Sequence, residues 1–230
     1  MIPLRSMAWA VLPLLFVPGG PMAAAQAGTQ GQIRFTYENP KLQPQKYVLT
    51  VGEDGAGHFR SEAGAAPSDG QSVPVESPVE SLDRPIHVSK SLREAMFAIT
   101  RKNKLFAIHC DDGDKNIAFQ GTKTLAYEGP EGQGSCVYNW SKNSQIDKLT
   151  DQFESMAATL EEGSKLQREY EHGRLSLDSE MEILDQMVGE GRAIEVENIA
   201  PILQTLAGDE AVLQRVQRRA RALLQLAKSD

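Results

Sequence analysis

The sequence predicts an α+β protein, in which a small mainly antiparallel sheet with one covering helix is followed by a four-helix C-terminal region. Two observations carry this prediction. Between residues 32 and 140, apolar and polar residues alternate with period two and turn residues interrupt them; from residue 141 onward, apolar residues recur at steps of three and four. We therefore expect a sheet domain over 28–140 and a helical region over 141–230.

The first 27 residues have the pattern of a secretory signal peptide. Arg5 is their only charged residue, an apolar run follows over 7–17, and the segment ends on the small residues Ala25 and Ala27. A membrane-spanning helix needs about 20 apolar residues, so we expect cleavage after Ala27 rather than an uncleaved anchor. The sequence thus predicts an extracytoplasmic protein, periplasmic or secreted, without a transmembrane span.

Charge and cysteine content narrow the classes of partner and site. Without residues 1–27 the chain has 23 basic and 31 acidic residues, a net charge of −8. We expect no nucleic-acid partner, because such binding is dominated by basic contacts to phosphate. Cys110 and Cys136 are the only cysteines, and in an oxidising compartment we expect them to form a disulfide rather than two reactive thiols.

The sheet domain contains one strand, one hairpin and further strands around a helix. Residues 32–38 alternate as a half-buried strand, and residues 46–62 form a hairpin around the glycine-containing turn "GEDGAG". Residues 89–103 have helical spacing, and residues 115–140 supply two or three more strands. These elements account for the predicted sheet and its covering helix.

The segment 61–85 is predicted to be a mobile surface loop. It contains four prolines and no aromatic residue, so it buries too little apolar surface to offset its ordering entropy. A tolerated insertion is the favoured interpretation, and a functional lid is the alternative.

Four helices are expected after residue 141. The first carries the apolar stripe Ile146, Leu149, Phe153, Met156 and Leu160, and the second begins near residue 179. Pro201 predicts a kink or a late start in the third helix, and Asp209 is expected to cap the fourth. The last two helices, "IAPILQTLAGDEAVLQRVQRRARALLQLA", form a predicted hairpin that resembles one unit of a HEAT-type helical repeat; no second copy supports a solenoid.

Two surfaces of the helical region are candidates for partner binding. Leu149, Phe153 and Met156 lie on the apolar stripe, which either is core or forms a dimer seam or partner groove. Arg215, Arg218 and Arg219 form a basic cluster. This cluster either docks on the acidic helices before it or contacts an anionic partner or lipid headgroups.

The stretch "IHCDDGDKN", residues 108–116, is the strongest candidate for a metal site and still a weak one. Asp112, Asp114 and Asn116 occupy the first, third and fifth positions of a calcium-loop pattern, but Ile117 replaces its glycine and Lys123 its glutamate. A strand end, a disulfide and a turn explain the stretch better, so neither a metal nor another cofactor is expected.

No catalytic motif occurs in the chain, including G-x-S-x-G, H-E-x-x-H, the P-loop and G-x-G-x-x-G. We therefore expect a non-catalytic exported protein that binds another protein, or itself, through its helical half. The alternative is a small-ligand-binding or hydrolytic domain whose site lies in the sheet half beside the 61–85 loop.

Overall fold

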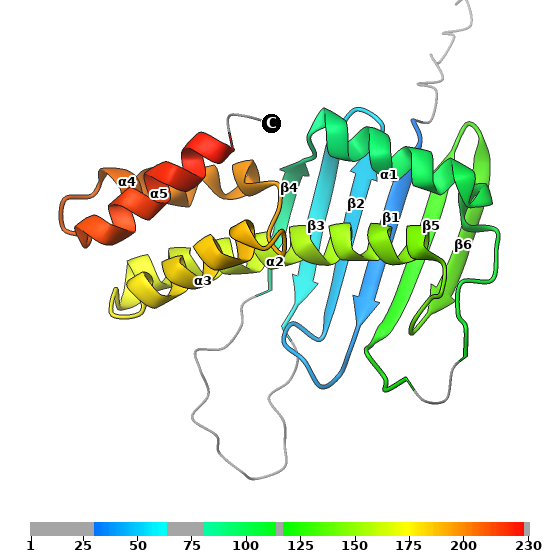
Figure 1. The fold of residues 1–230 in the computed structure, drawn as a ribbon, viewed down its shortest axis with the longest axis horizontal. Helices are drawn as coiled ribbons and strands as arrows, with labels where there is room; N and C mark the ends of the chain where they lie inside the picture. The colour runs from blue at the N-terminus through cyan, green and yellow to red at the C-terminus, as the bar shows by residue number, and fades with distance from the viewer. Residues whose placement is uncertain (1–29, 64–80, 114–116, 228–230) are drawn as a thin grey trace, which may run out of the picture.

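The computed structural model describes residues 30–63, 81–113 and 117–227 (Figure 1). The expected signal peptide, most of the 61–85 loop and the weak metal candidates Asp114 and Asn116 lie outside these ranges. The described part is an α+β fold of one antiparallel sheet and five α-helices, which confirms the predicted fold class.

The sheet is an antiparallel layer with one buried face. Its strands are β1 (Gln32–Glu38), β2 (Lys46–Gly52), β3 (Ala56–Glu62), β4 (Asp83–His87), β5 (Thr122–Gly129) and β6 (Gly132–Tyr138). They lie in the order β4-β3-β2-β1-β5-β6. The alternation in β1 places Ile33, Phe35 and Tyr37 on the buried face, while Gln32 and Arg34 face solvent, as the period of a half-buried strand requires.

Two helices cover the buried face: the expected covering helix and the first helix of the C-terminal region. Helix α1 (Lys90–Lys102) crosses one end of the strands, and helix α2 (Ser144–His172) crosses the middle of the sheet (Figure 1). The stripe of α2 packs on the sheet, where Phe153 stacks on Phe35 with ring centroids 5.0 Å apart. The second half of α2 continues past β4, so this helix belongs to both the sheet layer and the helical region.

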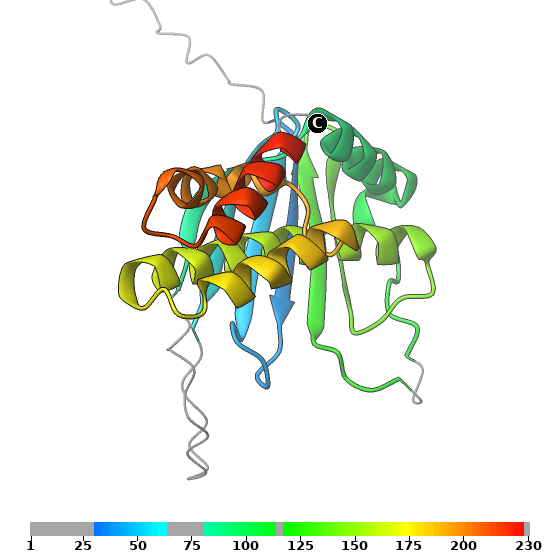
Figure 2. The same ribbon diagram turned by 60° about the vertical axis from the view of Figure 1, so that its left-hand side comes forward.

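The remaining helices pack around the projecting half of α2 (Figure 2). They are α3 (Leu177–Gly189), α4 (Ala200–Gly208) and α5 (Gln214–Leu226), with a short 3-10 turn η2 (Val196–Ile199) before α4. Pro201 lies in the first turn of α4, which is the late start that its fixed φ allows. The prediction that Asp209 caps α5 is wrong: its Oδ1 accepts a bond from the Ala211 amide at 2.8 Å, and α5 begins five residues later.

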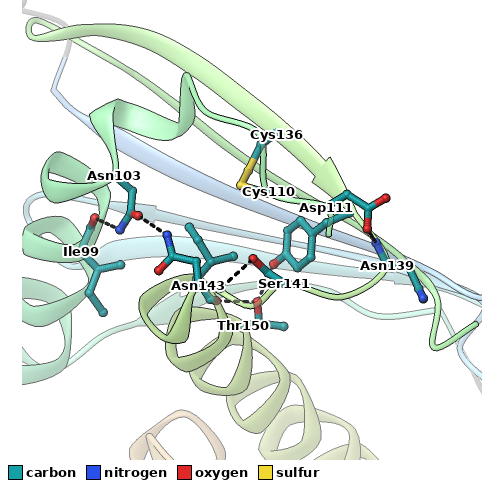
Figure 3. Close-up of a disulfide and its surroundings, with 11 residues drawn as sticks. Ile99, Asn103, Cys110, Asp111, Cys136, Asn139, Ser141, Asn143 and Thr150 are labelled. Atoms are coloured by element: carbon teal, nitrogen blue, oxygen red, sulfur yellow. Dashed lines mark hydrogen bonds between the residues drawn. A yellow bond between two sulfur atoms is a disulfide. The ribbon is translucent and has the colours of Figure 1, made fainter. Parts of the chain in front are cut away.

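The disulfide expected from the cysteine count is present. Cys110 and Cys136 are bonded, with their Cα atoms 5.8 Å apart, and both are buried. The bond ties the chain that follows the 3-10 turn η1 (Lys104–Phe106) to strand β6 (Figure 3). Beside it, Asn143 caps α2 and donates from Nδ2 to Oδ1 of Asn103 at 2.7 Å, which joins the start of α2 to the end of α1.

Candidate functional site

The apolar stripe that was a candidate partner surface is part of the core. Leu149 and Phe153 are fully buried and Met156 is 2% exposed. Of the two interpretations, core and partner seam, the geometry therefore matches core, because the sheet already covers these side chains.

The basic cluster on α5 mostly contacts the molecule's own acidic helix. The Nε of Arg215 lies 2.5 Å from Oδ1 of Asp178, and Arg219 pairs with Asp178 at 3.2 Å and with Glu182 at 3.3 Å. Arg218 is exposed. Two of the three arginines thus hold α5 on α3, while the Arg215 side chain remains 58% exposed.

The acidic stretch after Cys110 binds backbone. The Asp111 carboxylate accepts a hydrogen bond from the backbone N–H of Asn139 at 3.4 Å. The Asp112 carboxylate accepts one from the backbone N–H of Lys142. Within the described ranges, no three histidine, cysteine or carboxylate side chains gather in a way that could hold a metal ion. Asp111 and Asp112 therefore position the chain that leads into α2.

An apolar groove, which we call the interhelical groove, lies between α1 and the C-terminal helices. It has a volume of about 710 Å³ and is lined by side chains from α1, α2, α3, α5 and the chain around η2. Its apolar walls include Leu92, Val188, Ala193, Ile194, Val196 and Leu226. Leu226 is 55% exposed, so part of this apolar surface faces solvent.

Glu195 and Ser89 both line the groove and are hydrogen-bonded to each other. Glu195 adopts a left-handed backbone conformation with φ +56°, which turns the chain into η2. Its carboxylate accepts hydrogen bonds from the amide and the hydroxyl of Ser89, both at 2.7 Å. These bonds connect the start of α1 to the helical region. Asp185 and Glu195 are the charged lining residues of the groove, so its rim is acidic.

Gln152 provides a polar group in the same groove. It projects from α2, and its Oε1 is buried without a hydrogen-bond partner among the described residues. Buried acceptors are normally satisfied. A donor from a bound molecule could meet this acceptor, so the groove combines apolar walls with a hydrogen-bonding group, as ligand sites commonly do.

A second, smaller hollow of about 320 Å³ lies between α2 and one end of the strands, and we call it the sheet-end cavity. Strand register explains its floor. The floor consists of Lys123, Tyr37 and Tyr47, which are successive cross-strand partners on β5, β1 and β2. Ser61 on β3 is the next residue of this row, and all four residues are buried. Helix α2 crosses this row with Glu154, Ala157, Ala158 and Glu161.

The titratable groups of the sheet-end cavity are perturbed by burial. Desolvation raises the pKa of Glu154 and of Glu161 above the ordinary value of 4.5. Burial and the neighbouring Glu154 also raise the pKa of Tyr47 well above its usual range. Perturbed groups that line one hollow mark it as a candidate binding site.

Sequence reasoning found neither hollow, because each is assembled from segments that lie far apart in the chain. Ser89 and Glu195 are 106 residues apart, and the cavity row spans β1 to β5.

The chain matches no protein-family model and no curated protein. In the part of the chain that the structure describes, no helix has the length and apolar character needed to cross a membrane.

Proposed function

We propose that the protein is a non-catalytic, extracytoplasmic binding protein that holds an apolar segment of a partner protein in the interhelical groove. The observation that carries the proposal is the groove itself, with about 710 Å³ between helices and the half-exposed Leu226 on its wall. An apolar hollow of this size is typical of binding sites. The signal-peptide pattern of residues 1–27 and the Cys110–Cys136 disulfide support the extracytoplasmic assignment.

The groove also favours a particular chemistry in the partner. Its apolar walls suit side chains such as leucine or valine, whose burial contributes roughly 1.5–3 kcal/mol each. The carboxylates of Asp185 and Glu195 favour a cationic residue beside that apolar segment. A partner segment with apolar residues at helical spacing and one flanking lysine or arginine matches both features.

Leu226 and Leu213 provide a matched pair of variants for the test. Both leucines are 55% exposed, so either can be changed to aspartate with little effect on the core. Leu226 lines the groove at the end of α5, whereas Leu213 precedes the first residue of the same helix and does not line the groove. The two substitutions differ in whether they place a charge in the groove and in the end of α5 that receives the charge.

The experiment is affinity capture from the native envelope and medium, with a tag in segment 61–85, followed by direct binding of the captured partner to purified protein. We expect the wild type and Leu213→Asp to bind one stoichiometric protein partner, and Leu226→Asp to lose it while its circular dichroism spectrum is unchanged. Equal binding by both variants, or a small apolar molecule in the groove instead of a protein, would overturn the proposal.

A further inference from the structure

The sheet-end cavity is separate from the interhelical groove although both use α2. Gln152 lines the groove, while Glu154 and Glu161 line the cavity. Because residues of an α-helix are spaced by about 100°, Glu154 projects roughly 200° around the helix from Gln152. The two hollows therefore open on different faces of α2, and a ligand of one does not occupy the other.

The walls of the cavity are aromatic on one side and small on the other. Tyr37 and Tyr47 are cross-strand partners whose rings stack, with centroids 5.1 Å apart and an interplanar angle of 23°. Ala157 and Ala158 line the cavity from α2. Larger residues at these alanines would fill the space, so the small side chains of α2 create the hollow over the tyrosine rings.

The carboxylates of Glu154 and Glu161 lie on either side of these alanines in the sequence of α2. Of the two carboxylates, only that of Glu154 pairs with a cation that lines the cavity. Glu154 lies 3.6 Å from Nζ of Lys123, which is 6% exposed and also donates to the Asn139 carbonyl at 3.3 Å. The carboxylate of Glu161 accepts a hydrogen bond from the Ser61 hydroxyl. Its Oε1 is buried and has no hydrogen-bond partner among the described residues.

The nearest lysine on α2 does not satisfy Glu161, because another carboxylate already holds it. Nζ of Lys165 lies 2.6 Å from Oε1 of the adjacent Glu162. Two carboxylates and one ammonium group thus line the cavity, which leaves an excess of negative charge beside apolar and aromatic surface. Desolvation raises the pKa of both carboxyl groups, whereas Lys123 lowers that of Glu154 and the nearby Lys165 and Arg168 lower that of Glu161.

We propose that the sheet-end cavity binds a small organic ammonium ion, whose nitrogen pairs with the carboxylate of Glu161 and whose alkyl part packs between Ala157, Ala158 and the rings of Tyr37 and Tyr47. A charge-assisted hydrogen bond supplies the polar contact. The alkyl chain buries apolar surface against the two alanines and the tyrosine rings. This ligand site is independent of the protein-binding groove.

The test uses n-butylammonium as the probe and 1-butanol as its neutral isostere, in ¹H–¹⁵N NMR titrations of the full mature chain. We expect n-butylammonium to shift the amide signals of Ala157, Ala158 and Tyr47 saturably, and 1-butanol to bind at least about tenfold more weakly, because it lacks the charge-assisted bond. Equal affinity for the two probes, or no saturable shift with n-butylammonium, would overturn the proposal.

Two variants locate the site, and one serves as a control. Glu161→Gln should lower the affinity for n-butylammonium by about tenfold or more, and Ala158→Leu should abolish binding by filling the cavity while all charges remain. Glu171→Gln changes an exposed carboxylate of the same helix outside the cavity and should leave the affinity unchanged. A wild-type affinity in either cavity variant would reject the assigned site.

Discussion

The side chain of Asn198 makes both of the backbone hydrogen bonds that a neighbouring strand would make to His87. The His87 amide donates to Oδ1 of Asn198 at 2.7 Å, and Nδ2 of Asn198 donates to the His87 carbonyl at 2.8 Å. Arg84 adds a third contact, from its guanidinium to the Asn198 carbonyl at 2.6 Å. Because β4 is an edge strand with unpaired backbone groups, η2 caps this edge and anchors the helical region to the sheet.

Removing this cap should destabilise the protein and loosen β4. Asn198→Ala deletes two hydrogen bonds to the backbone of β4, so we expect a loss of about 2 kcal/mol in the free energy of unfolding and faster hydrogen exchange at the His87 amide. Urea unfolding and hydrogen exchange measure the two effects. Gln204→Ala, an exposed change on α4, serves as control and should stay within about 0.5 kcal/mol of the wild type; the same value for both variants would contradict the role of Asn198.

The disulfide should contribute to stability through the loop that it closes. Cys110 and Cys136 are 26 positions apart, and a loop of that length corresponds to about 3.5 kcal/mol in the chain-entropy model. We expect the free energy of unfolding of the double variant Cys110→Ala/Cys136→Ala to be lower by that amount. The variant should therefore unfold at a lower urea concentration. A reducing agent should shift the wild-type midpoint and leave the variant unchanged; an unshifted wild type after complete reduction would contradict this expectation.

Local periodicity was sufficient to predict most of the fold. The buried series Ile33, Phe35 and Tyr37 follows directly from alternation in β1, and the stripe of α2 follows from its steps of three and four. In both cases the signal lies within one element, because burial on one face selects apolar residues at the period of that element.

Strand β4 and the two hollows could not be predicted in this way. β4 has five residues with Pro85 among them, in a segment whose composition predicts a loop; it is stable at the edge because Asn198, 111 residues away, pairs with it. In the same way, the environment of Glu161 depends on Ser61 and Tyr47, which come from other strands of the sheet. Contacts between distant segments determine these features, and a single sequence carries no local signal for them.

Gly121 should tolerate no side chain, because it supports the tyrosine wall of the sheet-end cavity. It has φ +112°, and a Cβ atom there would lie 2.7 Å from the ring of Tyr37. Backbone strain and overpacking together predict a loss of about 3 kcal/mol for Gly121→Ala. Gly113 also has a positive φ, +57°, but a Cβ atom at that position would meet no described atom within 4 Å, so Gly113→Ala should cost only about 1 kcal/mol. Equal losses in thermal or urea unfolding would show that the contact with Tyr37 is unimportant.

The raised pKa of Glu161 predicts a particular dependence of stability on pH. Burial raises this pKa above 4.5 in the folded protein, so the folded state binds the proton more tightly than the unfolded state, and stability falls as pH rises from about 4.5 through the folded pKa. Glu161→Gln removes this term, so its stability relative to the wild type should increase between pH 4 and pH 7 in urea unfolding.

Glu131 provides the control of opposite sign. The hydrogen bond from Arg101 lowers the pKa of its carboxyl group, so Glu131 contributes stability that is present above 4.5 and is lost as pH falls through the folded pKa. Glu131→Gln should therefore lose stability relative to the wild type between pH 4 and pH 7, while Glu161→Gln gains it. If both variants changed in the same direction, the assignment of Glu161 as a buried carboxylate without sufficient positive charge would fail, and with it the electrostatic basis for an ammonium ligand in the sheet-end cavity.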